Sequence, residues 1–173
     1  KRSPKGIRYL IFTHYHADHT YGAFEFRNVE IVSHASCRDW LLERGQAGLD
    51  AARAQTPEFA DARLSIPAVV FEGGEMTLRM GNKTLQLLHS PGHTLDSIVV
   101  HIKEDKILFA ADTVMPVPYI VDGEPKSFVE SLKMIRCLSL ENVVQGHGEV
   151  VLRGEINETV DSSARYLEAI QAK

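Results

Sequence analysis

The sequence predicts an α/β fold, in which two groups of β-strands are sandwiched by helices on the outside. Two observations carry this prediction. Short apolar runs of strand length are bounded by Gly, Pro and Asn, and segments with helical spacing of apolar residues lie between and after them. A chain of 173 residues with 44% hydrophobic and 24% charged residues can bury the core of one globular domain. We therefore expect residues 1–173 to form a single soluble domain.

The first part of the chain predicts the order strand, helix, strand. Residues 9–12 are an apolar run that ends in Thr13 and His14, which is typical of a buried strand leading into a loop. Residues 18–26 suit a short helix, and residues 30–33 suit the next strand. This order is typical of parallel strands joined by a right-handed crossover.

The remaining elements follow from the same rules. We expect Ser36 to cap a helix that ends near residue 44, followed by helix or loop over residues 47–62. Gly73-Gly74 and Gly81-Asn82 are turn signals, which predict a meander of three strands around them. The expected later elements are strands 69–71, 76–80 and 83–89, a hairpin of 98–102 with 106–110, a helix over 127–138, a strand over 142–145 and a closing helix over 158–172.

Charge and composition exclude several classes of partner. The 19 basic and 23 acidic residues are scattered and give a net charge of −4, which disfavours nucleic acid as a partner. No apolar run reaches the length of a membrane span, so we expect no membrane. The two cysteines, Cys37 and Cys137, are too few for a disulfide framework, and we expect reduced thiols and a cytoplasmic protein. A small-molecule substrate is the expected partner, and the oligomeric state stays open.

A dense group of potential metal ligands follows the first predicted strand. Between residues 14 and 19 the sequence His-Tyr-His-Ala-Asp-His holds three imidazoles and one carboxylate. Residues two apart on extended backbone project to the same side, so His14 and His16 can bind one metal. Asp18 and His19 lie where the chain enters the predicted helix and can face a second metal. No structural need explains such a density of ligands.

Three more candidate ligands stand at the ends of later strands. His93 follows a Pro-Gly turn that brings its side chain back over the sheet edge. Asp112 follows the apolar strand 107–110. His147 follows the strand 142–145, and the flanking Gly146 and Gly148 permit close approach of the backbone.

Together these segments resemble the metallo-β-lactamase superfamily, with its H-x-H-x-D-H motif, G-H-T histidine, bridging aspartate and terminal histidine. The resemblance runs from Thr13 to about Val151 and implies an αββα metallo-β-lactamase sandwich with the site at one edge between two sheets. It also implies that the domain is N-terminally incomplete, because family members carry several strands before the first motif. We therefore expect either a fragment that lacks the N-terminal part of the first sheet or a protein that borrows those strands from elsewhere. The implied ligand set is His14, His16 and His93 for a first zinc, Asp18, His19 and His147 for a second zinc, and Asp112 as the bridge.

The aspartate at position 112 resembles the branch of glyoxalase II thioesterases and lactonases, since true β-lactamases generally have Cys or Ser there. We expect two Zn²⁺ ions per chain, with Fe²⁺ or Mn²⁺ as alternatives. Zinc lowers the pKa of bound water to about 7, so a bridging hydroxide can attack the substrate. Asp18 is the predicted catalytic residue, because it would orient this hydroxide as well as bind metal. The prediction is a binuclear zinc hydrolase of an ester, thioester or lactone bond.

Three other readings stay open at this stage. A persulfide dioxygenase has a very similar motif but uses one iron on the first-site ligands. A nuclease similar to the tRNA-processing members would need a basic approach to the site. A domain without its upstream strands could bind metal poorly and have no turnover. Outside the motif, His34 and His101 are expected as packed or surface residues, and His89 as a strand residue or a donor behind the ligands.

Overall fold

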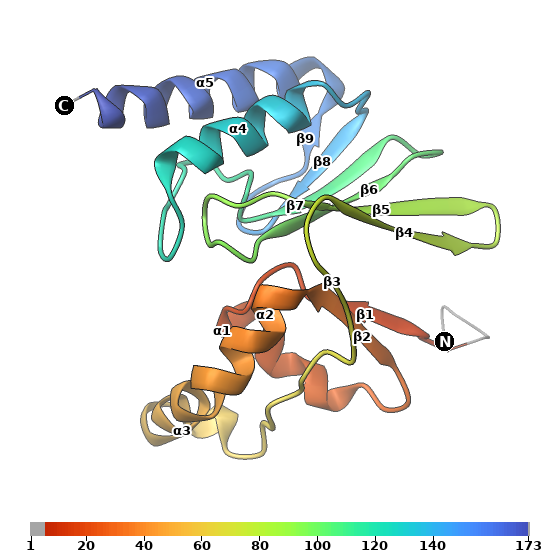
Figure 1. The fold of residues 1–173 in the computed structure, drawn as a ribbon, viewed down its shortest axis with the longest axis vertical. Coiled ribbons are helices and arrows are strands. Elements are labelled where there is room, and N and C mark those ends of the chain that lie inside the picture. The colour runs from red at the N-terminus through yellow and green to blue at the C-terminus, as the bar shows by residue number, and fades with distance from the viewer. Residues whose placement is uncertain (1–5, 173) are drawn as a thin grey trace. The chain divides into compact units, whose positions relative to one another are not determined.

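Two β-sheets organise the fold, one in each half of the chain (Figure 1). The computed structural model describes residues 6–172. The chain divides into an N-terminal unit, Lys1–Glu72, and a C-terminal unit, Gly73–Lys173. Each unit has its own sheet, its own helices and its own hydrophobic clusters.

The N-terminal unit has a parallel sheet of three strands in the order β1-β2-β3. The strands are β1 (Tyr9–Ile11), β2 (Glu30–His34) and β3 (Val69–Phe71). The connection from β1 to β2 holds helix α1 (Ala17–Thr20) and a 3₁₀ helix, η1 (Tyr21–Glu25). The structure therefore confirms the predicted order of strand, helix and strand and the parallel pairing of the two strands. The sequence did not indicate that the second part of the helical connection, η1, has 3₁₀ geometry.

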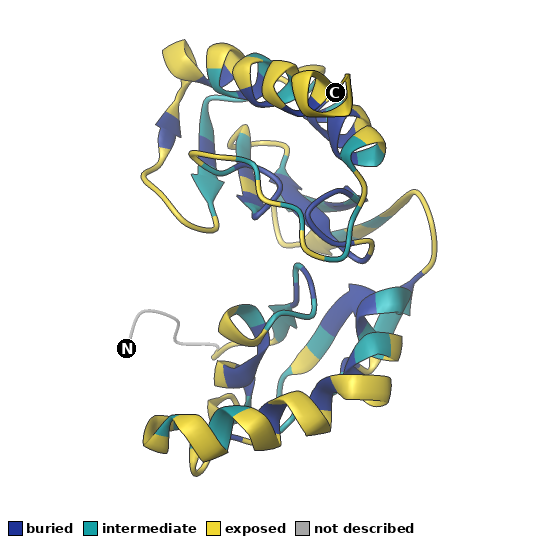
Figure 2. Cartoon of the chain, turned by 90° about the vertical axis from the view of Figure 1, so that its left-hand side faces the viewer, coloured by how far each residue is buried: buried dark blue, intermediate teal, exposed yellow. Residues whose placement is uncertain are grey.

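A long helical segment connects β2 to β3. It runs through α2 (Ala35–Trp40), a π-helical turn η2 (Leu41–Gly45) and α3 (Gln46–Gln55), and a short 3₁₀ helix η3 (Pro57–Phe59) follows. Figure 2 shows that the helices of this unit are exposed on one side and buried on the other. Two clusters form the core of this unit: Phe12, Ala23, Cys37 and Leu41 in one, and Tyr21, Leu49 and Ala62 in the other.

The predicted cap of this helical segment is wrong. The helix begins at Ala35, one residue before Ser36, and the capping side chain is that of His34. The main-chain N–H of Ser36 donates to His34 Nδ1 at 3.2 Å. An imidazole at the N-cap position thus takes the place of the expected hydroxyl, and it satisfies one of the N–H groups that a helix start leaves without a partner.

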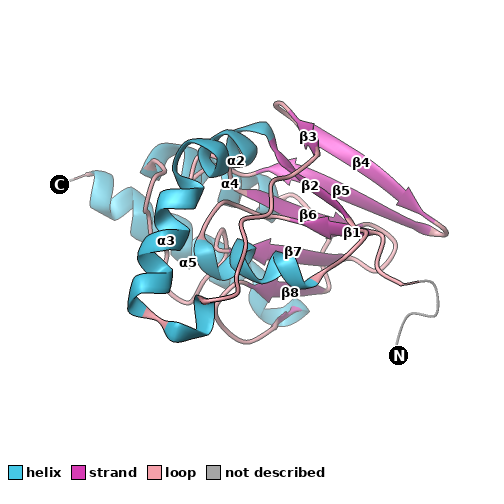
Figure 3. Cartoon of the chain, turned by 90° about the horizontal axis from the view of Figure 1, so that it is seen from below, coloured by secondary structure: helices cyan, strands magenta, loops and turns pink. Residues whose placement is uncertain are grey.

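The C-terminal unit has a sheet of six strands in the order β4-β5-β6-β7-β8-β9, of which Figure 3 labels β4 to β8. All neighbours are antiparallel except β7 and β8, which are parallel. The strands are β4 (Glu75–Met80), β5 (Lys83–His89), β6 (Ile98–Ile102), β7 (Ile107–Ala111), β8 (Asn142–Gln145) and β9 (Val151–Leu152).

Two helices, α4 (Pro125–Arg136) and α5 (Arg153–Gln171), lie on one face of this sheet (Figure 1). Their apolar side chains and those of the central strands form one buried cluster. A fully buried Leu or Phe side chain contributes about 1.5–3 kcal/mol to stability, so this cluster is the main source of stability of the unit. Its largest fully buried members are Leu108, Phe128, Leu132, Ile135 and Leu167.

The predicted meander is wrong at its first strand. β3 pairs with β2, in register Val32 with Val69, and not with β4. Gly73 and Gly74, both with positive φ, therefore lead from one sheet to the next instead of turning a hairpin. The turn at Gly81-Asn82 and the hairpin of β6 and β7 are confirmed. The closing helix begins at Arg153, five residues earlier than expected, because it follows directly on the two-residue strand β9.

His101 is a buried histidine on β6, in agreement with the prediction that it is a packed or surface residue. It pairs with Gln86 and Leu108 on the neighbouring strands. Neither of its ring nitrogens has a hydrogen-bond partner within residues 6–172. Burial, reinforced by Lys103 and opposed by Glu104, lowers the pKa of His101.

This lowered pKa predicts a loss of stability on acidification. A histidine with a lower pKa in the folded state binds fewer protons when folded, so the stability of the folded state is unaffected by it above about pH 6.5 and falls as the pH drops below that value. We expect the metal-free protein to lose more unfolding free energy between pH 7.5 and pH 5.5 than a His101→Phe variant does. Urea unfolding at both pH values measures this, and equal losses would contradict it.

Candidate metal centre

The N-terminal unit brings the four predicted ligands of the H-x-H-x-D-H motif together. The Nε2 atom of His14 lies 3.0 Å from Nδ1 of His16, and the rings of His14 and His19 are 4.2 Å apart between centroids. His19 Nε2 lies 3.2 Å from Asp18 Oδ2. Two nitrogen ligands at about 2.0–2.1 Å from one zinc ion are about 3.4 Å apart, so the separation of His14 and His16 is close to that of a shared ion.

The backbone of this motif is fixed by the start of α1. The main-chain N–H of His19 donates to the carbonyl oxygen of His16 at 3.1 Å, and the hydroxyl of Thr20 donates to the same oxygen at 2.9 Å. These bonds turn the chain sharply after His16. Asp18 and His19 therefore lie in the helix, and the ring of His19 still lies as close to His14 as the ring of His16 does.

The C-terminal unit brings its three predicted ligands together around Asp112. One oxygen of Asp112, Oδ2, lies 3.4 Å from Nε2 of His93 and 3.6 Å from Nε2 of His147. The side chains of His93 and Asp112 are buried, whereas that of His147 is 55% exposed. A carboxylate between two imidazoles is the arrangement that a bridging ligand needs.

The backbone at Asp112 is tightly constrained. Ala111 has φ 44°, a left-handed conformation that is costly for a residue with a Cβ and that concentrates at functional sites. Gly146 donates its N–H to the carbonyl of Ala111 at 2.8 Å. A Cβ on Gly146 would lie 1.9 Å from Asp112 Oδ1, so only glycine fits there. The sequence predicts a close approach of the backbone beside His147, and the structure shows the backbone of Gly146 lying directly against Asp112.

The orientation of His93 is set by a main-chain carbonyl. Its Nδ1 lies 2.6 Å from the carbonyl oxygen of Tyr119. Because a carbonyl can only accept, Nδ1 carries the proton and Nε2, which faces Asp112, keeps its lone pair for a metal. The preceding turn is anchored by Ser131, whose hydroxyl donates to the carbonyl of Pro91 at 2.7 Å.

The histidines outside the motif have other roles. His34 caps α2, and His101 is packed in the six-stranded sheet. His89 ends β5, and its Nε2 lies 2.8 Å from the carbonyl oxygen of Leu95, which it holds within its own loop. The carbonyl of Tyr119 is the group behind a ligand that sequence reasoning missed, because a main-chain oxygen carries no residue signal.

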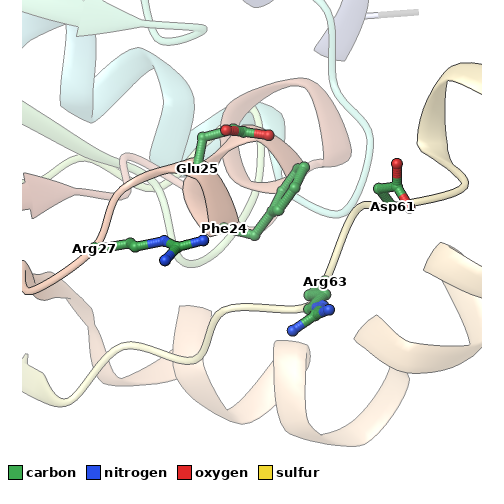
Figure 4. Close-up of a pocket in the computed structure, with 5 residues that line it drawn as sticks. All are labelled: Phe24, Glu25, Arg27, Asp61 and Arg63. Carbon is green, nitrogen blue, oxygen red and sulfur yellow. The ribbon is translucent and has the colours of Figure 1, made fainter.

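One cavity of the N-terminal unit lies away from the predicted ligands. It has a volume of about 470 Å³ and is lined by Phe24, Glu25, Arg27, Asp61 and Arg63 (Figure 4). Two cations and two anions share it, and it contains none of the predicted ligands. We therefore place the chemistry at the histidine clusters and not in this cavity.

Comparison with known proteins decides the family. The family model of the metallo-beta-lactamase superfamily matches residues 1–173. The chain belongs to this superfamily. Among solved structures, the metallo-beta-lactamase from Pontibacter korlensis is 21% identical, with a TM-score of 0.69 over 91% of this chain and 69% of that one. A metallo-beta-lactamase family protein from Thermus thermophilus is 18% identical, with a TM-score of 0.71 over 95% and 62%. The predicted metallo-β-lactamase fold is thus confirmed.

Two curated proteins that are similar to this chain have the names of hydrolases. The acyl-coenzyme A thioesterase MBLAC2 of Bos taurus is 30% identical over 85% of this chain and 55% of its own length. A hydroxyacylglutathione hydrolase of Rhodopseudomonas palustris is 29% identical over 75% of this chain and 43% of its own. The chain spans about half the length of these relatives. Metallo-β-lactamase proteins generally bind divalent metals, and the imidazole and carboxylate groups in each unit are suitable donors.

The contact between Gly146 and Asp112 yields a direct test. We expect Gly146→Ala to lower the unfolding free energy by about 1–3 kcal/mol, because the added methyl group overlaps the carboxylate and the chain must shift. Gly154→Ala is the control, because its Cβ meets nothing within 4 Å. Urea unfolding of both variants measures the difference, and equal stability would show that Asp112 is not held against Gly146.

Proposed function

We propose that this metallo-β-lactamase chain is the metal-binding part of a zinc-dependent hydrolase that cleaves an ester, thioester or lactone bond. The observation that carries the proposal is the position of one oxygen, Asp112 Oδ2. It lies within 3.6 Å of both His93 and His147, the two imidazoles assigned to different metals. A carboxylate oxygen in that position is suited to bridge two cations.

The proposed ligand set joins the clusters of the two units. It requires residues 1–173 to act as one domain. Imidazole nitrogen and carboxylate oxygen favour zinc, and they also accept Fe²⁺ or Mn²⁺. We assign His14, His16 and His93 to the first zinc, Asp18, His19 and His147 to the second, and Asp112 to both.

The residues around the ions have separate tasks in this proposal. Zinc held by these residues would lower the pKa of a bound water to about 7 and would polarise the substrate carbonyl. Asp18 orients the attacking oxygen through its carboxylate. The buried Asp112 holds the two halves of the ligand set together, and the carbonyl of Tyr119 keeps His93 in the tautomer that binds metal.

A thioester is the foremost substrate class. One relative is named an acyl-coenzyme A thioesterase and another a hydrolase of an acylated glutathione, which are both acyl derivatives of thiols. The net charge of −4 favours a small molecule over nucleic acid. Neither Cys37 nor Cys137 forms a disulfide, which is consistent with a reducing, cytoplasmic location. No helix within residues 6–172 is both long enough and apolar enough to cross a bilayer.

The bridging role of Asp112 is tested by its removal. We expect two zinc ions per chain after loading and dialysis, fewer than two in Asp112→Ala, and a loss of thioester turnover of roughly 100-fold or more, because the remaining ligands hold the pair weakly. Elemental analysis and hydrolysis of thioester, lactone, β-lactam and phosphodiester substrates are the measurements.

Asp39→Ala is the control for this variant, since Asp39 is an exposed carboxylate on α2. It should keep both the zinc content and the turnover. Full activity in Asp112→Ala would refute the bridge. One iron per chain with thiol-dependent oxygen uptake would instead identify a dioxygenase.

A further inference from the structure

A small apolar cavity lies directly beside His16 in the N-terminal unit. Its volume is about 190 Å³, and none of its lining side chains is a carboxylate. One end of the cavity is formed by the metal-ligand motif and the other by the helical segment that follows β2. It is lined by Tyr15, His16, Ala17, Tyr21, Leu41, Arg44, Gly45 and Gly48.

Aromatic contacts fix one wall of this cavity. The ring of Tyr15 packs edge-on against Trp40, with 4.7 Å between ring centroids, and edge-on against His16 at 4.7 Å. The guanidinium of Arg44 lies over both rings, 4.6 Å from the centroid of Trp40 and 5.6 Å from that of Tyr15. Such stacked contacts hold each side chain from two sides. The wall is therefore continuous from the helix to the proposed ligand His16.

Two glycines also line the cavity. Gly45 ends the π-helical turn, and Gly48 lies one turn later in α3. A Cβ on Gly48 would lie 3.1 Å from the hydroxyl oxygen of Tyr21, and a Cβ on Gly45 would lie 3.0 Å from a methyl group of Leu64. Single π-helical turns often occur at functional sites, because the extra residue redirects the side chains around them.

The lining of the cavity is mostly apolar. Burial, with a contribution from Asp50, raises the pKa of Tyr21, so its phenol stays neutral at physiological pH. Leu41 is fully buried and closes the cavity beside it. Arg44 is the one lining side chain that carries a permanent charge.

We propose that this cavity binds the apolar acyl group of the substrate and so sets the chain length that is hydrolysed. The proposal rests on the proposed thioester hydrolysis at the same site. An acyl chain seated between Leu41, Tyr21 and Tyr15 would direct its carbonyl carbon toward His16, which both lines the cavity and is a proposed metal ligand. The volume is about that of six water molecules in the liquid, which suits a short chain of a few carbon atoms.

A series of acyl thioesters of one thiol tests this assignment. We expect kcat/KM to rise about fourfold for each methylene from acetyl to hexanoyl, as each buried methylene leaves water, and to level off or fall at longer chains, where the cavity is full. Gly48→Leu should lower the ratio of hexanoyl to acetyl turnover at least tenfold. Leu41→Ala widens the cavity and should shift the preferred chain to a greater length.

Gly22→Leu is the matched control. Gly22 is an exposed glycine in the adjacent 3₁₀ helix η1, it does not line the cavity, and its Cβ would meet nothing within 4 Å. This variant should keep the parental profile of chain lengths. Identical chain-length profiles for the parent, Gly48→Leu and Leu41→Ala would overturn the proposal.

Trp40 provides a readout that is independent of turnover. It is the only tryptophan of the chain and contacts both Tyr15 and Arg44, so its fluorescence reports on occupancy of the cavity. Metal-free protein titrated with hexanamide should show a saturable change, which acetamide and the Gly48→Leu variant should not reproduce. Saturable binding without thioester turnover would retain the cavity and refute the proposed function. Turnover without binding, and without dependence on chain length, would retain the function and refute the cavity.

Discussion

The parallel pairing of β7 and β8 is the constraint on which the ligand cluster of the C-terminal unit depends. All other neighbours in this sheet are antiparallel, so β5, β7 and β8 run in the same direction and end at the same edge. His93, Asp112 and His147 each follow the end of one of these strands. His93 and His147, proposed ligands that are 54 residues apart in the sequence, thus meet around one carboxylate oxygen of Asp112.

The cost of this arrangement is concentrated in the backbone beside Asp112. A residue with a Cβ at φ 44° is destabilised by about 1–3 kcal/mol, and such strain persists only where the surroundings fix it. Here the hydrogen bond from Gly146 to Ala111 and the irregular register between Phe109 and Ala111 supply that fixation. This conformation turns the Asp112 carboxylate toward His93 and His147. With ordinary strand geometry, the chain would instead continue β7 alongside β8.

Features that depend on near neighbours in the sequence were predictable, and those that depend on distant ones were not. The alternation in the H-x-H-x-D-H motif, the turn at Gly81-Asn82 and the apolar strand before Asp112 are local signals, and the structure places them as expected. The strand with which β3 pairs could not be predicted, because its three apolar residues would fit either sheet equally well. Two further features were not predicted, for another reason. His34 was missed as a cap because an imidazole is an uncommon capping group. The carbonyl of Tyr119 was missed because every residue has a main-chain oxygen.

The two tasks of the proposed metal-dependent hydrolase, metal binding and substrate selection, fall on different kinds of element. The proposed ligands stand at strand ends, whose positions are fixed by hydrogen bonding and by the buried core, so they tolerate little change. The apolar cavity takes half of its lining residues from the helical segment from Ala35 to Gln55. His16 belongs to both, since its ring meets His14 on one side and Tyr15 on the other. In the proposed hydrolase, substitutions in the helical part of the lining would therefore alter the preferred chain length without removing a proposed ligand.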